Sequence, residues 1–159
     1  MINHYDLKLA DYRSLAGFRY QLRRFLRFSE DAARQAGLEP QHHQLMLAVK
    51  GKPDDDEPRI AYLAERLQIQ HHSAVELVDR LVKKGLITRT RDGEDRREVH
   101  VHLTTRGEKV LGELTLHMRE ELQSAAPALV ASLRKLVPAA TSRAARLRRP
   151  PAALRRRHP

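Results

Sequence analysis

The stretch that decides the fold runs from Leu77 to Gly107 and reads LVDRLVKKGLITRTRDGEDRREVHVHLTTRG. Its first part has the apolar spacing of a helix that ends at Gly85, because glycine readily adopts the left-handed conformation that closes many helices. Two segments follow, Leu86–Arg91 and Glu98–Leu103, with a turn-forming Asp-Gly pair between them. In the second segment valine and leucine alternate with polar residues, as in a half-buried strand. We therefore expect a helix followed directly by a charged β-hairpin.

Two short helices upstream complete a winged helix-turn-helix. The first is predicted at Arg59–Leu67 and the second at about His71–Lys84, with Gln68–Gln70 as the turn between them. The residues expected to be buried on these helices are Ile60, Leu63, Ala64, Leu67, Ala74, Val75, Val78, Leu81 and Val82. An arginine-rich hairpin tip beside an exposed helix can address the two grooves of one DNA duplex.

Before this unit, apolar residues recur at helical spacing between about positions 7 and 36. Gly37 is the expected helix stop and Glu39-Pro40 the expected restart. A short helix is then predicted at Gln41–Val49, with Leu45, Leu47 and Val49 partly buried. The apolar stripe of the first helix comprises Leu15, Phe18, Leu22, Phe25 and Leu26.

After the hairpin, a last helix is predicted over about residues 105–137. Thr104 or Thr105 is the expected N-cap, and Glu108 would close a capping box with Thr105. Pro127 is a point of expected interruption. The apolar stripe of this helix comprises Leu111, Leu114, Met118, Leu122, Ala125, Leu129 and Leu133.

The net charge of +10 is concentrated at the C-terminus. Nine of the 30 Lys and Arg residues lie at or after Arg134, which leaves 21 basic against 20 acidic residues in the rest of the chain. The high pI is therefore a poor argument for nucleic-acid binding, which must rest on where the charges lie. From Pro138 the composition shifts to Ala, Arg and Pro, which predicts a disordered basic tail over 138–159.

Composition also narrows the class of protein. The chain contains no cysteine, which excludes disulfides and thiolate metal sites. It has no apolar run of membrane-spanning length and no secretory signal, so a cytoplasmic protein is the default expectation. The 159 residues suffice for one domain with a real core.

Three segments, LAERLQI, SAVELVDRLVKKGLITR and DRREVHVHLTTRG, resemble the MarR (multiple antibiotic resistance regulator) family. The resemblance covers roughly Phe18 to Leu136 and implies a mainly α fold with a small β-hairpin wing. Residues 1–137 would form one domain, with dimerisation helices at about 7–36 and 105–137 and the winged helix-turn-helix at about 40–104. It further implies a homodimer on a pseudo-palindromic DNA operator, usually a repressor, and often one released by a small aromatic or phenolic effector.

DNA recognition would be carried by the start of the second helix-turn-helix helix and by the wing. The helix candidates are Gln70, His71, His72, Ser73, Glu76 and Arg80, because the N-terminal end of such a helix enters the major groove. The wing candidates are Arg91, Arg96 and Arg97, and by resemblance Arg97 enters the minor groove while Asp95 stabilises the wing through an ion pair.

Two of these positions have competing interpretations. Ser73 could be a helix N-cap without any DNA contact. Glu76, where the family commonly has a small hydroxyl residue, is expected to pair with Arg80 at the i,i+4 spacing. Leu77 is a second departure, since the family commonly has a basic residue there. These departures bear on the operator sequence rather than on the class of protein.

Other functions are less well supported. The nine histidines suggest a metal-responsive regulator as an alternative. The candidate pairs are His42-His43, His71-His72 and His100/His102, and none completes a four-ligand site. No metal ligand or cofactor is therefore predicted. No enzyme motif occurs, and the acids of 54–57 suggest a solvated loop. A winged-helix module for protein contacts remains an alternative.

An effector pocket near the first two helices is implied by the resemblance alone. Tyr12, Arg19, Arg23 and His43 could line it, although we favour the ordinary interpretation of each as a surface residue. The effector-binding residues therefore stay open.

Overall fold

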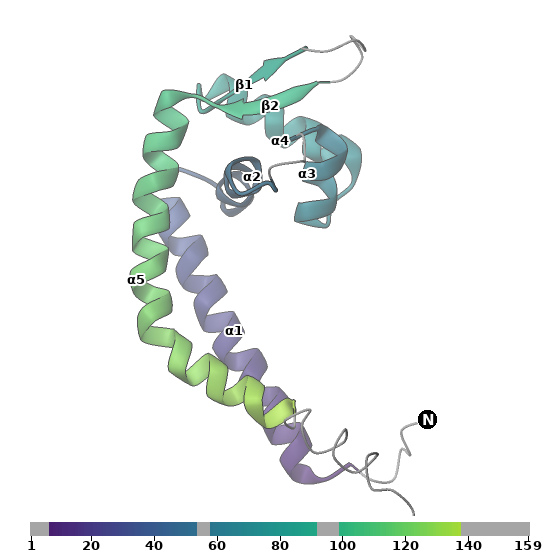
Figure 1. The fold of residues 1–159 in the computed structure, drawn as a ribbon, viewed down its shortest axis with the longest axis vertical. Coiled ribbons are helices and arrows are strands. Elements are labelled where there is room, and N and C mark those ends of the chain that lie inside the picture. The colour runs from purple at the N-terminus through teal and green to yellow at the C-terminus, as the bar shows by residue number, and fades with distance from the viewer. Residues whose placement is uncertain (1–6, 54–57, 92–98, 138–159) are drawn as a thin grey trace, which may run out of the picture. The chain divides into compact units, whose positions relative to one another are not determined.

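The computed structural model of the chain describes residues 7–53, 58–91 and 99–137 (Figure 1). The elements follow in the order α1 (Leu9–Gln35), α2 (Pro40–Lys50), α3 (Ile60–Leu67), α4 (His71–Lys83), β1 (Ile87–Thr90), β2 (His100–Leu103) and α5 (Thr105–Leu136). The predicted fold class, mainly helical with one small β-hairpin, is confirmed. Among the described residues, no helix is long and apolar enough to cross a membrane.

The chain divides into two compact units. Unit 1 comprises residues 1–22 and 125–159, and unit 2 comprises residues 23–124. Helices α1 and α5 each contribute one part to each unit, whereas α2, α3, α4 and the hairpin lie wholly in unit 2. The winged helix-turn-helix is therefore contained in a single unit.

Unit 2 is built around one hydrophobic cluster, to which every one of its helices and both strands contribute. α3 contributes Leu63. α4 contributes Ala74, Leu77, Val78 and Leu81, whose spacing of three and four residues places them on one face of the helix. The most deeply buried large side chains of the cluster are Leu45, Met46, Leu63, Leu81, Ile87, Val78 and Val101. Burial of such side chains contributes roughly 1.5–3 kcal/mol each, so this unit has a substantial core.

The helix-turn-helix turn lies where the sequence predicted it, between Leu67 and His71. Gln68 adopts a left-handed conformation with φ 55°, which is unusual for a residue other than glycine. Its side-chain amide donates to the carbonyl of Glu65 at 2.8 Å, and the amide of Ile69 donates to Ala64 at 3.0 Å. These bonds close the end of α3 and turn the chain into α4. The predicted stops at Gly37 and Gly85 are also confirmed, with φ 74° and 68°.

Two burial predictions were wrong on α4 and one on α2. Leu77 is buried and belongs to the α4 core face, whereas Val82 is exposed and Val75 is only partly buried. On α2, Leu47 is exposed, and its place in the core is taken by Met46. The buried face of α2 also includes His42 and His43. In both helices the phase set by tertiary packing differs from the one inferred from local apolar spacing.

The hairpin pairs β1 and β2 in antiparallel register, with Ile87 opposite Leu103 and Thr90 opposite His100. Ile87 and Val101 are fully buried on its inner face. The outer edge of β2 is covered by the chain preceding α3, because Val101 donates its amide to Pro58 at 3.1 Å and a β-bridge joins His100 to Arg59. β1 packs beside α4, so the hairpin and the second helix of the helix-turn-helix, α4, form one packed block (Figure 1).

The end of α4 and the start of α5 are joined by a set of hydrogen bonds. The Thr104 hydroxyl donates to Gly85 O at 2.8 Å and accepts from Gly107 N at 3.0 Å, so Thr104 is the N-cap of α5. Arg106 donates to Lys84 O at 3.3 Å. Only glycine fits at position 107, since a Cβ there would lie 2.0 Å from the carbonyl oxygen of Leu86. The predicted Thr105–Glu108 capping box is wrong, because Glu108 instead contacts Lys50 at 2.5 Å.

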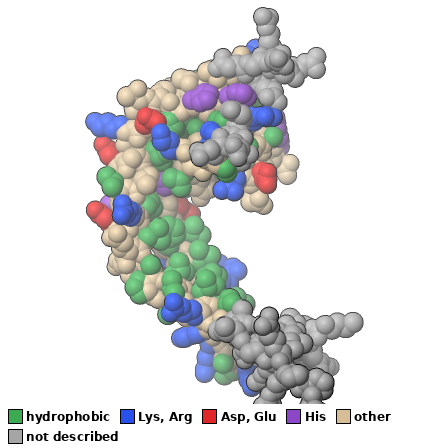
Figure 2. All heavy atoms as spheres, viewed as in Figure 1, with side chains coloured by type: hydrophobic (Ala, Val, Ile, Leu, Met, Phe, Trp, Pro, Cys, Tyr) green, Lys and Arg blue, Asp and Glu red, His purple; other side chains and the backbone are tan. Residues whose placement is uncertain are grey.

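Unit 1 contains no buried residue within its described positions, 7–22 and 125–137. α5 continues through Pro127 as a helix, so the expected interruption does not occur. Hydrophobic side chains gather along α1 and α5 in Figure 2. The large exposed ones of unit 1 are Leu7, Leu9, Tyr12, Leu15, Tyr20, Leu22, Val130, Leu133 and Val137.

Candidate nucleic-acid interface

The first turn of α4 presents an exposed polar surface. Gln70 is the N-cap residue and His71 and His72 are the first two helical residues, and all three side chains are exposed. Ser73 is partly buried in the third helical position, so the alternative that it is the N-cap is wrong. The N–H groups at the start of a helix carry a partial positive charge that favours phosphate. This end of α4 therefore suits an anionic partner.

The acidic residues of α4 are each paired with an arginine. Arg80 contacts Glu76 at 3.4 Å, which confirms the predicted i,i+4 pair, and it also lies 3.7 Å from Glu39 at the start of α2. Asp79 is paired with Arg89 of β1. These arginines offset the negative charges of Glu76 and Asp79, which would otherwise repel phosphate.

Arg89 was missed as a site residue by sequence reasoning. Its guanidinium pairs with Asp79 and also donates to the carbonyl of Val75 at 3.4 Å, so it joins the first strand of the hairpin to α4. The sequence signal that could have revealed it is a pair of opposite charges, one on a helix and one on the strand that follows that helix. Because α4 and β1 pack beside each other, residues ten apart in sequence come together.

The wing tip lies partly outside the described residues. Arg91 is exposed at the end of β1. Asp95, Arg96 and Arg97, together with the predicted Asp92-Gly93 turn, fall in 92–98, which the structure does not describe. Their expected roles stay predictions. The described part of the hairpin places the chain leading to them directly beside α4.

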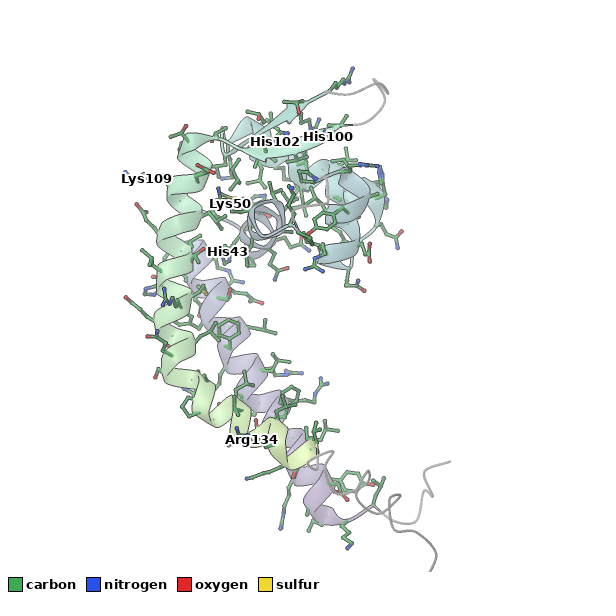
Figure 3. The ribbon with its side chains drawn as sticks, viewed as in Figure 1. His43, Lys50, His100, His102, Lys109 and Arg134 are labelled. Carbon is green, nitrogen blue, oxygen red and sulfur yellow. The ribbon has the colours of Figure 1, made fainter. Side chains whose placement is uncertain are left out.

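The three histidine pairs are separated by the fold. His42 and His43 are buried, His71 and His72 are exposed, and His100 and His102 lie on the outer side of β2 (Figure 3). The His102 ring nitrogen lies 3.1 Å from the Thr90 hydroxyl across the hairpin. Across the described ranges, no three His, Asp or Glu side chains gather in a way that could hold a metal ion.

The two buried histidines are electrostatically distinctive. His42 accepts a hydrogen bond at Nδ1 from the Glu39 amide at 3.3 Å. Burial lowers the pKa of His42, and the nearby cations Lys84 and Arg80 lower it further against the opposing effect of Glu39. Burial alone lowers the pKa of His43, whose Nε2 is buried without a hydrogen-bond partner among described atoms. Both imidazoles are therefore favoured in the neutral form.

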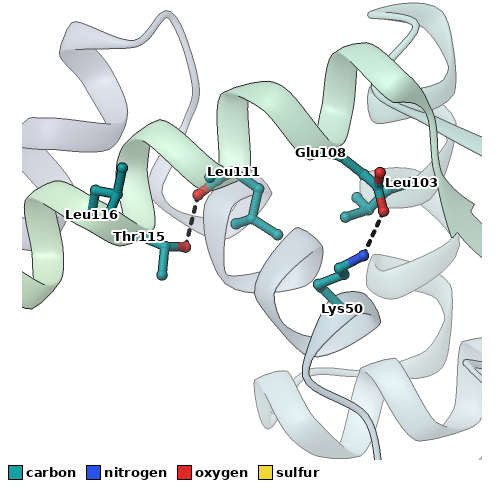
Figure 4. A pocket seen from close by; sticks show the side chains of 7 residues that line it. Lys50, Leu103, Glu108, Leu111, Thr115 and Leu116 are labelled. Carbon is teal, nitrogen blue, oxygen red and sulfur yellow. Dashed lines mark hydrogen bonds and ion pairs between the residues drawn. The ribbon is translucent and has the colours of Figure 1, made fainter.

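The residues expected around an effector are divided between the two units. Tyr12 and Arg19 belong to unit 1, whereas Arg23 and His43 belong to unit 2. Tyr12 is exposed, and the surface interpretation of His43 was wrong because its side chain is buried. A cavity of about 360 Å³ does occur in unit 2, between the end of α2, the end of β2 and the first turns of α5 (Figure 4).

These elements define the chain as a winged helix-turn-helix protein. Residues 36–98 match the model of the MarR family. The resemblance to the MarR family that the sequence predicted is confirmed for this segment.

Relatives and solved structures are similar to this chain to different extents. An uncharacterised HTH-type transcriptional regulator of Bacillus subtilis (strain 168), YsmB, is 31% identical over 64 residues, or 40% of this chain. The chain spans 44% of the length of that relative. Among solved structures, AbsC, a MarR family transcriptional regulator from Streptomyces coelicolor, superposes with a TM-score of 0.66 at 16% identity, covering 87% of this chain and 97% of AbsC. A MepR mutant of S. aureus bound to an oligodeoxyribonucleotide gives 0.58 at 19% identity, covering 82% and 88%. At these identities the structures show the fold alone.

Proposed function

We propose that the chain is a DNA-binding transcriptional regulator that acts as a homodimer on a pseudo-palindromic operator. The observation that carries the proposal is the block formed by α4 and the hairpin. It presents an exposed helix N-terminus beside a hairpin whose tip sequence is rich in arginine. In winged helix-turn-helix proteins this pair of elements contacts neighbouring grooves of one duplex.

The base-reading residues are Gln70, His71, His72 and Ser73 at the start of α4. Glu76 accepts a hydrogen bond from Arg80 and orients it, and Arg91 with Arg96 and Arg97 supplies the wing contacts, held by Asp95. Arginine gains in a narrow minor groove from the enhanced negative potential there. Histidine and serine can donate to or accept from base edges and phosphates.

The homodimer is supported by unit 1, where α1 and α5 carry apolar side chains that the single chain leaves exposed. Exposed apolar surface of this extent is a feature of interaction sites. A two-fold dimer would present two copies of α4, which matches the symmetry of a palindromic site. In the similar MepR structure, that protein is bound to an oligodeoxyribonucleotide.

We infer a repressor that responds to a small aromatic or phenolic effector, by analogy with the family. A protein-contact module is not favoured, because the hairpin tip sequence is rich in arginine. The metal-responsive alternative has no supporting observation.

The test is selection of operator DNA from random fragments, followed by electrophoretic shift. Arg97→Ala should cost about 1–3 kcal/mol of operator affinity and leave the thermal melting of the protein nearly unchanged. Arg119→Ala, an exposed arginine of α5 far along the chain from the wing, is the matched control and should bind as the parent does. If the parent selects no sequence, the proposal fails. Equal operator binding by Arg97→Ala and the parent would remove the wing from recognition.

A further inference from the structure

Arg80 lies between two carboxylates, one from its own helix and one from α2. Its guanidinium donates to Glu76 Oε2 at 3.4 Å and lies 3.7 Å from Glu39 Oε2 at the start of α2. The spacing of four residues places His72, Glu76 and Arg80 on one face of α4. His72 is exposed and belongs to the turn that is proposed to meet DNA, so Arg80 and its two acids lie along the same surface.

The side chains of Glu39, Glu76 and Arg80 together carry one excess negative charge. The arginine side chain is 51% exposed and each carboxylate side chain is 63% exposed, so solvent screens both ion pairs. Exposed pairs of this kind are weak and can exchange partners. Two acids on one arginine nevertheless leave no excess positive charge at this point to attract a phosphate. In the free protein Arg80 is therefore held back from anions.

Glu39 is positioned by contacts of its own backbone and of the residues around it. Its amide donates to Nδ1 of the buried His42 at 3.3 Å. Lys84, one turn beyond Arg80, donates to the carbonyl of Gly37 at 3.5 Å and so joins the chain before α2 to α4. Glutamate is an unusual N-cap residue, since Asn, Asp, Ser and Thr are preferred there. The longer acid at this position points to a use of its carboxylate beyond capping, and the group that it reaches is Arg80.

We propose that Glu39 is a specificity-determining residue, which together with Glu76 keeps Arg80 from the phosphates of DNA that lacks the preferred sequence. On such DNA a phosphate must displace two carboxylates to gain Arg80, so the net gain is small. On the preferred sequence the other contacts fix an acceptor in a geometry that suits the guanidinium, and there the exchange stabilises the complex. Unfavourable contacts that weaken the wrong complex more than the right one create specificity. The inference rests on the proposed function for its partner, double-stranded DNA.

Binding of fluorescent duplexes by the full-length protein, over a series of salt concentrations, tests the inference. One duplex carries the sequence selected from random fragments, and the other has the same bases in shuffled order. Glu39→Gln should bind the shuffled duplex about threefold tighter, and Glu39→Gln with Glu76→Gln about tenfold tighter, while the selected duplex gains less than about twofold. On the shuffled duplex the slope of log K against log salt should steepen by about 0.9, the value for one more phosphate contact.

Three further variants separate the contact with Arg80 from general effects. Glu120→Gln, at an exposed acid of α5, is the matched control for the loss of one negative charge and should bind both duplexes nearly as the parent does. In an Arg80→Gln background, Glu39→Gln should have no more effect than Glu120→Gln. Glu39→Asp keeps the charge and favours the start of α2, but withdraws the carboxylate from Arg80. It should therefore show part of the gain on the shuffled duplex with no loss of thermal stability.

The inference is overturned if Glu39→Gln affects the shuffled duplex no more than Glu120→Gln does, or if its effect persists without Arg80. An equal gain on both duplexes would also overturn it, because Glu39 would then oppose all DNA alike. A parent that selects no sequence would defeat the proposed operator. The measurements on the shuffled duplex would then still decide whether the two acids keep Arg80 from phosphate.

Discussion

The two units of this chain use the same kind of helix in opposite ways. In unit 2, parts of α1 and α5 bury Ala33, Leu111 and Leu114 in a core shared with three other helices and a hairpin. In unit 1 the remaining parts of α1 and α5 bury nothing within the described residues. In the single chain many apolar side chains of these segments therefore stay exposed. The difference teaches that unit 2 is stabilised by its own packing, whereas the proposed dimer would supply the surface that covers unit 1.

The largest expected effect is on assembly. The pair Leu15→Glu and Leu133→Glu replaces two exposed leucines of unit 1, at 50% and 44% exposure. In a lone chain such surface changes alter stability by less than about 0.5 kcal/mol. In a dimer that buries them they should cost several kcal/mol and dissociate it, as sedimentation would measure. Leu47→Glu, at a comparably exposed leucine of unit 2, is the control. A doubly substituted chain that remains a dimer would remove unit 1 from the interface.

The next effect tests the packing of unit 2. Gly107→Ala places a methyl group against the Leu86 carbonyl and should lower the free energy of unfolding by roughly 3 kcal/mol. Gly112→Ala, in the same helix but facing open space, should raise it by up to about 1 kcal/mol. Chemical denaturation at one protein concentration measures both. Equal effects of the two substitutions would show that the junction between α4 and α5 tolerates rearrangement.

The third effect is on folding stability and appears only at acidic pH. Burial holds the pKa of His43 below its ordinary value of 6.5 in the folded chain, so the stability this contributes is complete above pH 6.5. It is lost as the pH falls from 6.5 through the folded pKa, because the unfolded chain binds the proton more readily. His43→Leu should match the parent near pH 7.5 and lose less stability than the parent on acidification. His42, whose pKa is also lowered, is still present in the variant, so part of the dependence of stability on pH remains. Parallel melting curves for the two proteins at all pH values would contradict this origin.

The smallest effect concerns Arg89. Its ion pair with Asp79 is partly exposed, so Arg89→Met should cost no more than about 1 kcal/mol. It should accelerate amide exchange in β1 more than in α2, because the tie between strand and α4 is lost. Arg91→Met, at the exposed residue directly after β1, is the matched control. Unchanged exchange in β1 would mean that apolar packing alone holds the hairpin.

Local signals in the sequence were sufficient for the elements of unit 2. Gly37 and Gly85 end α1 and α4 because the chain adopts a left-handed backbone conformation there, which glycine accommodates best. The buried face of β2 follows from the alternation of Val101 and Leu103 with histidines. The pairing of Glu76 with Arg80 follows from helix geometry alone.

Features that depend on distant parts of the chain could not be predicted in this way. Residues 45–49 of α2 are all apolar, so their pattern does not say which face is buried, and packing selects Met46 over Leu47. At Leu77 the family commonly has a basic residue, so the resemblance gives no sign that this position belongs to the core face of α4. The contacts of Arg80 with Glu39, of Arg89 with Asp79 and of Glu108 with Lys50 each join different elements. Side chains of these types have many equivalent partners until the fold is known.

The bonds between Thr104 and residues 85–86 bear on how this protein can change over evolutionary time. The Thr104 amide donates to Leu86 O at 3.0 Å and its hydroxyl donates to Gly85 O, so the two ends of the segment between Leu86 and Thr104 are held together by hydrogen bonds. The entropy of closing such a loop grows only slowly with its length. Insertions and deletions between the two strands should therefore leave α4 and α5 undisturbed. Related chains can change the length and sequence of the hairpin connection without rebuilding the core.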